Sequence, residues 1–279
     1  MKTLRSSLVA GGIVYGESPR WHDDRLWLSD MHGGAIKTVD ADGDVEVAHE
    51  LDHPSGLGWL PDGALLVSVF RVAQVMQVDA GRQVVRYDLR DRGWSMNDMV
   101  VGPDGPAYAD LYTSRSNGYP IGAIVLLEPD GETRTVASDL ATPNGLAIAA
   151  DRSTLLVSET FSGRVLAYTI APDGSLVGGR VFADLGDDRR PDGLCVDAEG
   201  AAWVASPFTG EFLRVKDGGE ITHRIETPGC WAVAPALGGP DRRTLYLLVA
   251  DTDFERFRHG DSAARIESLQ VDVPGAGWP

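Results

Sequence analysis

Residues 191–206 read PDGLCVDAEGAAWVAS, and this stretch contains the pattern that decides the fold. A short apolar run, GLCV at 193–196, is followed by a polar turn, DAEG at 197–200, and then by AAWVAS at 201–206. Asp and Gly favour tight hairpin turns, because Gly adopts positive φ and the Asp carboxylate bonds to nearby backbone. The segment therefore predicts two antiparallel strands, and EFLRVKDGG at 211–219 predicts a third beside them.

The same order of runs and turns occurs six times along the chain, at a spacing of roughly 40 residues. Such a repeat is typical of a β-propeller, in which blades of three or four antiparallel strands bury their faces against one another. An all-β sandwich would not require six similar units. We therefore predict an all-β, six-bladed β-propeller that forms one domain over residues 1–279. The other five turns are HDD at 22–24, PDG at 61–63, PDG at 103–105, ADRS at 150–153 and GPDR at 239–242.

The two ends of the chain are predicted to close the ring together. The last repeat ends at Val273 with three runs, so it lacks an outer strand, and the run near residues 3–14 can supply it. This N-terminal run follows basic residues in the manner of a signal peptide. However, Gly11 and Gly12 interrupt its apolar stretch, and it lacks a convincing cleavage site. We expect a strand here, and a cytoplasmic protein.

The composition limits the classes of partner. The 279 residues include 25 Lys and Arg against 41 Asp and Glu, a formal net charge of −16. Nucleic acids and anionic membranes are bound through basic surfaces, so neither partner is expected. Only two cysteines are present, Cys195 and Cys230, which excludes a disulfide framework. We expect a small-molecule ligand and a monomer or small homo-oligomer.

Polar residues stand where the innermost strand of each predicted blade begins. In a propeller these positions converge on the central axis, and the loops between second and third strands open at the same end. Carboxylate and amide oxygens suit Ca²⁺, Mg²⁺ or Mn²⁺, and two carboxylates neutralise a divalent ion. As an alternative, Asn or Asp before Gly can serve only as a turn former, although this does not account for Glu17. The six positions are Glu17, Ser55, Asn97, Asn144, Asp192 and Cys230.

Several segments resemble the senescence-marker-protein/gluconolactonase family, also called the regucalcin-like family. The resemblance implies a six-bladed propeller with one divalent metal ion in its channel. It implies Glu17, Asn144 and Asp192 as metal ligands, with Asn97 contacting the metal or the substrate. The matching segments are GESPRW at 16–21, MND at 96–98, PNGLA at 143–147 and PDGLCVDAEGAAWVA at 191–205, and VDVPGAGWP at 271–279 is similar to family C-termini.

Many members of that family hydrolyse lactones, so the resemblance implies a metal-dependent lactonase. The metal would polarise the lactone carbonyl, and Asp192, the usual candidate base, would help to deprotonate water, with Asn97 beside it. Ca²⁺ is the first expectation, with Zn²⁺, Mn²⁺ and Mg²⁺ as alternatives. Two other functions stay open: the same metal site used for isomerisation, decarboxylation or ring formation, and a calcium-binding propeller without turnover.

One position departs from members that act on sugar acid lactones. They carry an Arg two residues before the Asn of MND, where this chain has Ser95. The predicted rim is rich in aromatic residues and poor in cations, which favours a hydrophobic lactone, an aryl ester or another cyclic ester. Some of these aromatic residues can instead pack loops against the ring. The candidate substrate contacts are Ser95, Met96, His32, Phe70, Arg71, Tyr112, Phe208 and Trp231.

Three of these neighbourhoods carry further expectations. His32 is a candidate proton shuttle or a surface-loop histidine without a role. Arg71 is an alternative source of the missing cation, supplied from a neighbouring blade. Asp98 is expected to point away from the channel or to hold Asn97 in place.

Overall fold

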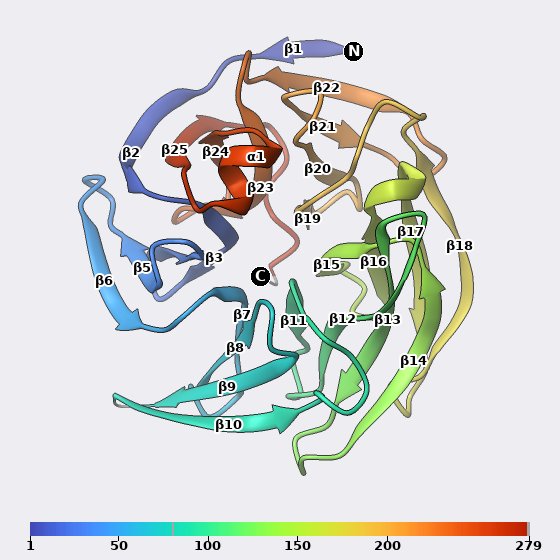
Figure 1. Cartoon of the computed structure of the whole chain (residues 1–279). Coiled ribbons are helices and arrows are strands. Elements are labelled where there is room, and N and C mark those ends of the chain that lie inside the picture. Colours follow the sequence, from blue (N-terminus) through green and yellow to red (C-terminus); the bar gives the residue numbers. More distant parts are fainter. Residues whose placement is uncertain (80, 278–279) are drawn as a thin grey trace.

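The computed structural model describes residues 1–79 and 81–277 and confirms the six-bladed β-propeller (Figure 1). Blade 1 contains β3 (Gly16–His22), β4 (Arg25–Asp30), β5 (Ala35–Val39) and β6 (Val45–Glu50). Blade 2 contains β7 (Pro54–Trp59), β8 (Leu65–Val69), β9 (Gln74–Asp79) and β10 (Arg82–Asp88). Blade 3 contains β11 (Met99–Val101), β12 (Ala107–Ser116), β13 (Tyr119–Leu127) and β14 (Thr133–Leu140).

The second half of the chain forms the other three blades. Blade 4 contains β15 (Pro143–Ile148), β16 (Thr154–Glu159), β17 (Arg164–Ile170) and β18 (Leu176–Asp184), with the 3₁₀ turn η1 (Thr160–Ser162). Blade 5 contains β19 (Leu194–Val196), β20 (Ala202–Ser206), β21 (Glu211–Val215) and β22 (Ile221–Glu226). Blade 6 contains β23 (Trp231–Gly238), β24 (Thr244–Asp251) and β25 (Ala263–Gln270), with helix α1 (Phe254–Arg258) between the last two.

All six predicted turns connect the first and second strands of a blade. The turn at 197–200 shows why the local sequence folds this way. Asp197 Oδ1 accepts hydrogen bonds from the backbone N–H groups of Glu199 at 3.0 Å and Ala201 at 3.1 Å. Its other oxygen accepts from Arg214 Nε at 2.7 Å, so the turn is also fixed to the third strand of its blade. The Asp residue thus closes the hairpin and anchors it.

Glycines on the inner strands let neighbouring blades approach closely. A Cβ on Gly145 would lie 2.3 Å from the backbone oxygen of Asp192, and one on Gly193 would lie 2.4 Å from the Cβ of Ala234. Neither glycine adopts positive φ. The Asn-Gly and Asp-Gly pairs at 144–145 and 192–193 are therefore not turns. Their glycines allow inner strands to pack, which leaves the Asn and Asp side chains available at the axis.

The N-terminal segment closes the ring as predicted, and does so twice. Strand β2 (Ser7–Ile13) pairs antiparallel with β25 and supplies the fourth strand of blade 6. Strand β1 (Lys2–Leu4), which was not predicted separately, pairs parallel with β22 as a fifth strand of blade 5. Figure 1 shows this segment running along the outside of both blades. The start of the chain therefore spans the seam between blades 5 and 6.

Two connections between second and third strands, at the end of the ring where the inner strands begin, differ from simple loops. Leu111 and Tyr112 lie inside β12, because the β12–β13 hairpin is long and turns only at Asn117 and Gly118. Blade 6 carries α1 in the connection between its second and third strands. In the part of the chain that the structure describes, no helix has both the length and the apolar character that crossing a membrane requires.

Candidate functional site

The four predicted oxygen-donor residues come together at the axis from blades 1, 3, 4 and 5. Glu17 lies in β3 and Asn144 in β15, whereas Asn97 and Asp192 each lie two residues before an inner strand, β11 and β19. Glu17, Asn97 and Asp192 are 6–7% exposed, and Asn144 is half-buried. Asn97 Nδ2 donates to Asn144 Oδ1 at 3.0 Å, and the Asn144 side chain bonds in turn to Asp192.

The carboxylates of Glu17 and Asp192 repel each other in a buried position. Burial raises the pKa of Glu17 well above its usual value, and the charges of Asp192 and Asp98 raise it further. Burial and Asp98 raise the pKa of Asp192 to about 8, against a hydrogen bond from Asn144 that lowers it. Among the ion pairs of the described residues, none joins a Lys or Arg to either carboxylate, whereas Asp98 is paired with Arg20.

This donor set fits a hard divalent cation. Two buried carboxylates without a basic partner need a positive charge, and hard cations prefer carboxylate and amide oxygens. Within residues 1–79 and 81–277, no cluster of three or more His, Cys, Asp or Glu side chains is arranged as a metal site. Any ion at the axis would therefore be held by the two carboxylates of Glu17 and Asp192 together with amide oxygens.

Asn97 is fixed on every side. Its Oδ1 accepts from Ser55 Oγ at 2.7 Å, and its backbone N–H donates to Asp110 Oδ1 at 2.5 Å. Its backbone oxygen accepts from Ser68 Oγ at 2.6 Å. Since Oδ1 is turned toward Ser55 and Nδ2 toward Asn144, this amide orients the amide oxygen of Asn144. Asp110 and Ser68, which the sequence did not indicate, together fix the Asn97 backbone.

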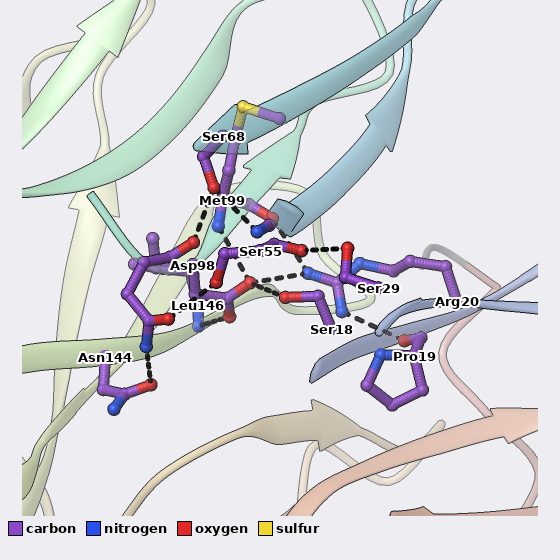
Figure 2. A network of polar contacts seen from close by, with 12 residues as sticks. Ser18, Pro19, Arg20, Ser29, Ser55, Ser68, Asp98, Met99, Asn144 and Leu146 are labelled. Atoms are coloured by element: carbon purple, nitrogen blue, oxygen red, sulfur yellow. Dashed lines mark hydrogen bonds and ion pairs between the residues drawn. The ribbon is translucent and has the colours of Figure 1, made fainter. Parts of the chain in front are cut away.

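Asp98 is the centre of a second polar network (Figure 2). Its Oδ1 accepts from Ser18 Oγ at 2.9 Å and from Arg20 Nη2 at 3.1 Å, and its Oδ2 accepts from the Leu146 N–H at 2.8 Å. Ser18 follows Glu17 directly, and Leu146 lies two residues after Asn144. Asp98 thus joins blades 1, 3 and 4 and fixes the strands that carry Glu17 and Asn144. It does not bond to the Asn97 side chain, in contrast to one of the two expectations.

Two tyrosines face the carboxylates. Burial and the charges of Glu17 and Asp192 raise the pKa of the Tyr15 phenol well above its usual value. Burial, Asp110, Asp192 and Glu17 have the same effect on the pKa of Tyr112. Both side chains are therefore buried phenols that stay protonated near the axis. Tyr112 was a predicted substrate contact, and Tyr15, which lies two residues before Glu17, was missed.

Helix α1 brings further aromatic rings to this end of the propeller. The ring centroid of Phe254 lies 4.8 Å from that of Phe208 and 5.3 Å from that of Trp231, and Phe257 lies 4.7 Å from Tyr15. Phe208 and Phe254 are 40% and 54% exposed. We call Tyr15, Phe208, Trp231, Phe254 and Phe257 the aromatic wall.

The helix was absent from the sequence reading, although a local signal for it exists. Asp253 is a typical N-cap residue, and its side chain accepts from the N–H groups of Glu255 at 2.9 Å and Arg256 at 3.0 Å. Phe254 and Phe257 are three residues apart, so they lie on one face of the helix. Phe70, a predicted contact, packs against the core cluster that also contacts Trp231 and Phe257.

His32 lies between the rings rather than on an open loop surface. Its ring centroid is 5.4 Å from that of Tyr15 and 4.9 Å from that of Phe257. Both ring nitrogens are buried, and neither has a hydrogen-bond partner within the described residues. Burial, His53 and Arg71 lower the pKa of His32, which keeps the imidazole neutral. Its role as a proton shuttle stays a prediction.

Ser95 and Met96 are not placed to contact a substrate, so these two assignments need correction. Both residues are 0% exposed. Ser95 Oγ accepts from the Arg71 N–H at 2.9 Å, and Met96 packs in the apolar core formed by blades 2 and 3. Because successive residues of an extended chain point to opposite sides, Asn97 faces the axis while Met96 faces the core.

The expectation that the rim is poor in cations is also wrong. The Arg115 guanidinium lies 4.4 Å from the centroid of the Trp94 ring, and Arg190 lies 6.0 Å from that of Phe161. Arg71 is exposed, and its guanidinium lies 5.8 Å from the centroid of Phe70. Three arginines therefore stand against aromatic rings at this end of the propeller, in an arrangement that provides cation–π attraction.

The fold and the site together define a six-bladed propeller with buried carboxylate and amide groups on its axis. The chain belongs to the SMP-30/Gluconolactonase/LRE-like family, whose sequence pattern matches residues 15–251. It is 27% identical over 275 residues to the pentonolactonase XacC of Haloferax volcanii. The match covers 95% of this chain and 92% of that protein. It is 25% identical to the 6-deoxy-6-sulfogluconolactonase of Pseudomonas putida, over 100% of this chain and 99% of that protein.

Solved structures support the fold independently. A calcium-binding protein, regucalcin, from Agrobacterium tumefaciens has a TM-score of 0.83 and 22% identity, covering 100% of this chain and 98% of that one. A luciferin-regenerating enzyme has a TM-score of 0.81 and 18% identity, covering 95% and 94%. Both likenesses concern the architecture, in which the inner strands of all six blades converge on one axis.

Proposed function

We propose that this protein is a metal-dependent hydrolase that opens a lactone less polar than a sugar acid lactone. Its membership of a gluconolactonase family and its similarity to proteins named as lactonases support lactone hydrolysis. The observation that carries the metal dependence is the buried pair of Glu17 and Asp192, which has no basic partner in the described chain and lies beside two amides. Ca²⁺ is the proposed ion, with Zn²⁺, Mn²⁺ and Mg²⁺ as alternatives.

Each polar residue has a distinct part in this proposal. Glu17, Asp192 and the amide oxygen of Asn144 would hold the ion, and Asn97 would keep Asn144 oriented. When bound, the ion supplies Lewis-acid polarisation of a carbonyl oxygen. Asp192, ionised when the ion is held, would act as the base that accepts a proton from water. The protonated phenols of Tyr15 and Tyr112 donate hydrogen bonds to substrate oxygens.

The aromatic wall supports a substrate with an apolar face. Phe208 and Phe254 expose ring surface at the end of the ring where the inner strands begin. Aromatic side chains bind apolar and aromatic groups through area burial and ring contacts. We therefore favour alkyl- or aryl-substituted lactones over aldonolactones. A small-molecule substrate is also in keeping with the net charge of −16, which opposes nucleic acids and anionic membranes.

The test is a lactone panel assayed with metal-stripped protein and after addition of Ca²⁺, Mn²⁺, Zn²⁺ or Mg²⁺. The panel pairs aldonolactones with alkyl and aryl lactones of the same ring size. We expect turnover that requires metal, that is abolished in Asp192→Asn and that is retained in Asp42→Asn, a matched change at an exposed turn carboxylate.

Two outcomes would contradict the proposal. Metal binding without hydrolysis of any lactone would favour another reaction at the same site or a calcium-binding propeller without turnover. A preference for aldonolactones would contradict the less polar substrate while leaving lactone hydrolysis intact.

A further inference from the structure

A small cavity at the seam between blades 5 and 6 lies outside the site described above. It has a volume of about 40 Å³. The residues around it come from both ends of the chain and from blade 5. Its lining consists of Lys2, Leu4, Trp203, Arg214, His223, Gln270, Val271, Asp272 and Val273.

The strand register explains why basic and donor groups meet there. Trp203 of β20 pairs with Arg214 of β21, Arg214 pairs with His223 of β22, and His223 pairs with Lys2 of β1. Directly paired residues project from the same face of a sheet. The four side chains therefore form one row across blade 5.

One side chain of the row, that of Trp203, has a hydrogen-bond donor without a partner among the described residues. Trp203 is 1% exposed, and its Nε1 is buried with no hydrogen-bond partner within the described residues. A buried donor without an acceptor destabilises the folded chain, because it has lost its hydrogen bond to water. The other indole of comparable position, Trp27, donates from Nε1 to the His22 oxygen at 3.1 Å. The Trp203 N–H thus has no acceptor among the described residues, and the Trp203 side chain lines the cavity.

The other polar side chains around the cavity already have hydrogen-bond or ion-pair partners. Arg214 is paired with Asp197 at 2.7 Å and Glu199 at 2.9 Å, and Lys2 with the 88%-exposed carboxylate of Asp272 at 3.8 Å. Gln270 Nε2 donates to Thr244 Oγ1 at 2.8 Å, and His223 Nδ1 lies 2.9 Å from Thr222 Oγ1.

The side chains of Trp, Arg and Lys only donate hydrogen bonds, so an occupant must accept. Burial lowers the pKa of His223, and the charges of Arg214 and Lys2 lower it further against the opposing charge of Asp272. The imidazole therefore stays neutral beside the two cations.

We propose that the cavity binds one small anion of the size of chloride, held by the Trp203 indole N–H together with Arg214 and Lys2. The volume exceeds the roughly 10–15 Å³ of such space that a single water needs, so a monatomic ion fits. The anion would join β1 to blade 5 beside the end of β25. It would thereby stabilise the seam at which the ring closes.

The first experiment uses crystals of the full chain soaked in sodium bromide, whose anomalous signal distinguishes bromide from water. We expect a peak in the cavity between Trp203, Arg214 and His223. Water density without anomalous signal would overturn the proposal. This measurement needs no variant and so does not depend on a substitution being tolerated.

The second experiment compares thermal unfolding in sodium chloride and in sodium methanesulfonate, an anion too large for the cavity, at equal ionic strength. We expect chloride at about five times its Kd to raise Tm by about 2–4 °C. Trp203→Phe should lose this rise, and Trp27→Phe, the matched control, should keep it. An equal rise in Trp203→Phe and the wild type, or a bromide peak at molar salt with no change in Tm, would overturn the proposal.

Discussion

Four buried carboxylates of this propeller fall into two settings, which differ in how their charge is balanced. Asp98 and Asp197 are paired with Arg20 at 3.1 Å and Arg214 at 2.7 Å, and each holds backbone segments together. Glu17 and Asp192 lie close to Asp98 but have no such partner among the described residues. Asp98 and Asp197 thus have their own cation, whereas the two axial carboxylates have none among the described residues.

The largest expected effect comes from breaking a buried ion pair, the setting in which the carboxylate has its own cation. Asp98→Asn removes a charge and leaves the 6%-exposed Arg20 side chain without its counter-ion. Loss of one partner of a buried pair costs about 3–5 kcal/mol. We expect the free energy of unfolding, measured in urea, to fall by that amount. Arg20→Met in the Asp98→Asn background should recover part of the loss, and no recovery would show that the hydrogen bonds to Ser18 and Leu146 matter more than the charge.

Neutralising a carboxylate that has no cationic partner should raise the stability of the metal-stripped chain rather than lower it. Asp192→Asn removes the repulsion with Glu17, so we expect the metal-stripped chain to become more stable by about 1–3 kcal/mol at pH 8 while losing metal binding. Urea unfolding and calorimetric titration with Ca²⁺ would measure the two effects. A variant that is destabilised as much as Asp98→Asn would contradict the distinction between the settings.

The pH dependence of the metal-stripped chain sharpens the same comparison. The folded pKa of Asp192 is raised to about 8, above its unfolded value near 4, so the folded state binds more protons across this window. The stability that this carboxyl contributes is present below about pH 4 and is lost as the pH rises to about 8. Unfolding measured from pH 5 to pH 9 should show the decline in the wild type and a smaller decline in Asp192→Asn.

Metal binding should follow the same proton. Because the ion must displace it, we expect Ca²⁺ affinity to fall by up to tenfold per pH unit below about pH 8. An affinity that is constant between pH 6 and pH 8 would argue that the two carboxylates are already ionised without metal.

The smallest expected effect concerns Phe254, a residue of the aromatic wall that belongs to neither setting. Phe254→Ala removes a 54%-exposed ring that contacts Phe208 and Trp231. We expect KM for an aryl lactone to rise about tenfold with little change in stability, since such ring contacts are worth about 0.5–1.5 kcal/mol. Val177→Ala, an exposed apolar residue on the outer strand β18, is the control. Equal effects on aldonolactones and aryl lactones would contradict a role in specificity.

The fold could be predicted because its determinants are local. Asp197 closes its own hairpin, and equivalent turn residues recur in every blade. The axial positions of Glu17 and Asp192 follow from the order of strands alone. By contrast, the support of Asn97 by Asp110 and the reach of Asp98 to Leu146 depend on register within and between blades. Short-range patterns do not specify that register.

Substrate-facing residues were harder to predict for a related reason. Which side of the chain faces the axis changes with each residue, so Met96 lies in the core although it is adjacent to Asn97. Helix α1 interrupts the repeat, and a search for strands and turns passes over it. Tyr15 was missed because its nearness to the carboxylates arises from packing around the axis, which the repeat pattern does not show.

The double use of the N-terminal segment has a consequence for synthesis of the chain. Ser6 Oγ donates to Glu267 at 2.5 Å, a contact between residues 261 positions apart. During translation, β1 and β2 have no partners until blades 5 and 6 leave the ribosome, so their edges stay open while the first four blades take shape. Contacts this distant in sequence slow folding. The ring can therefore close only once β25 is available to pair with the first residues of the chain.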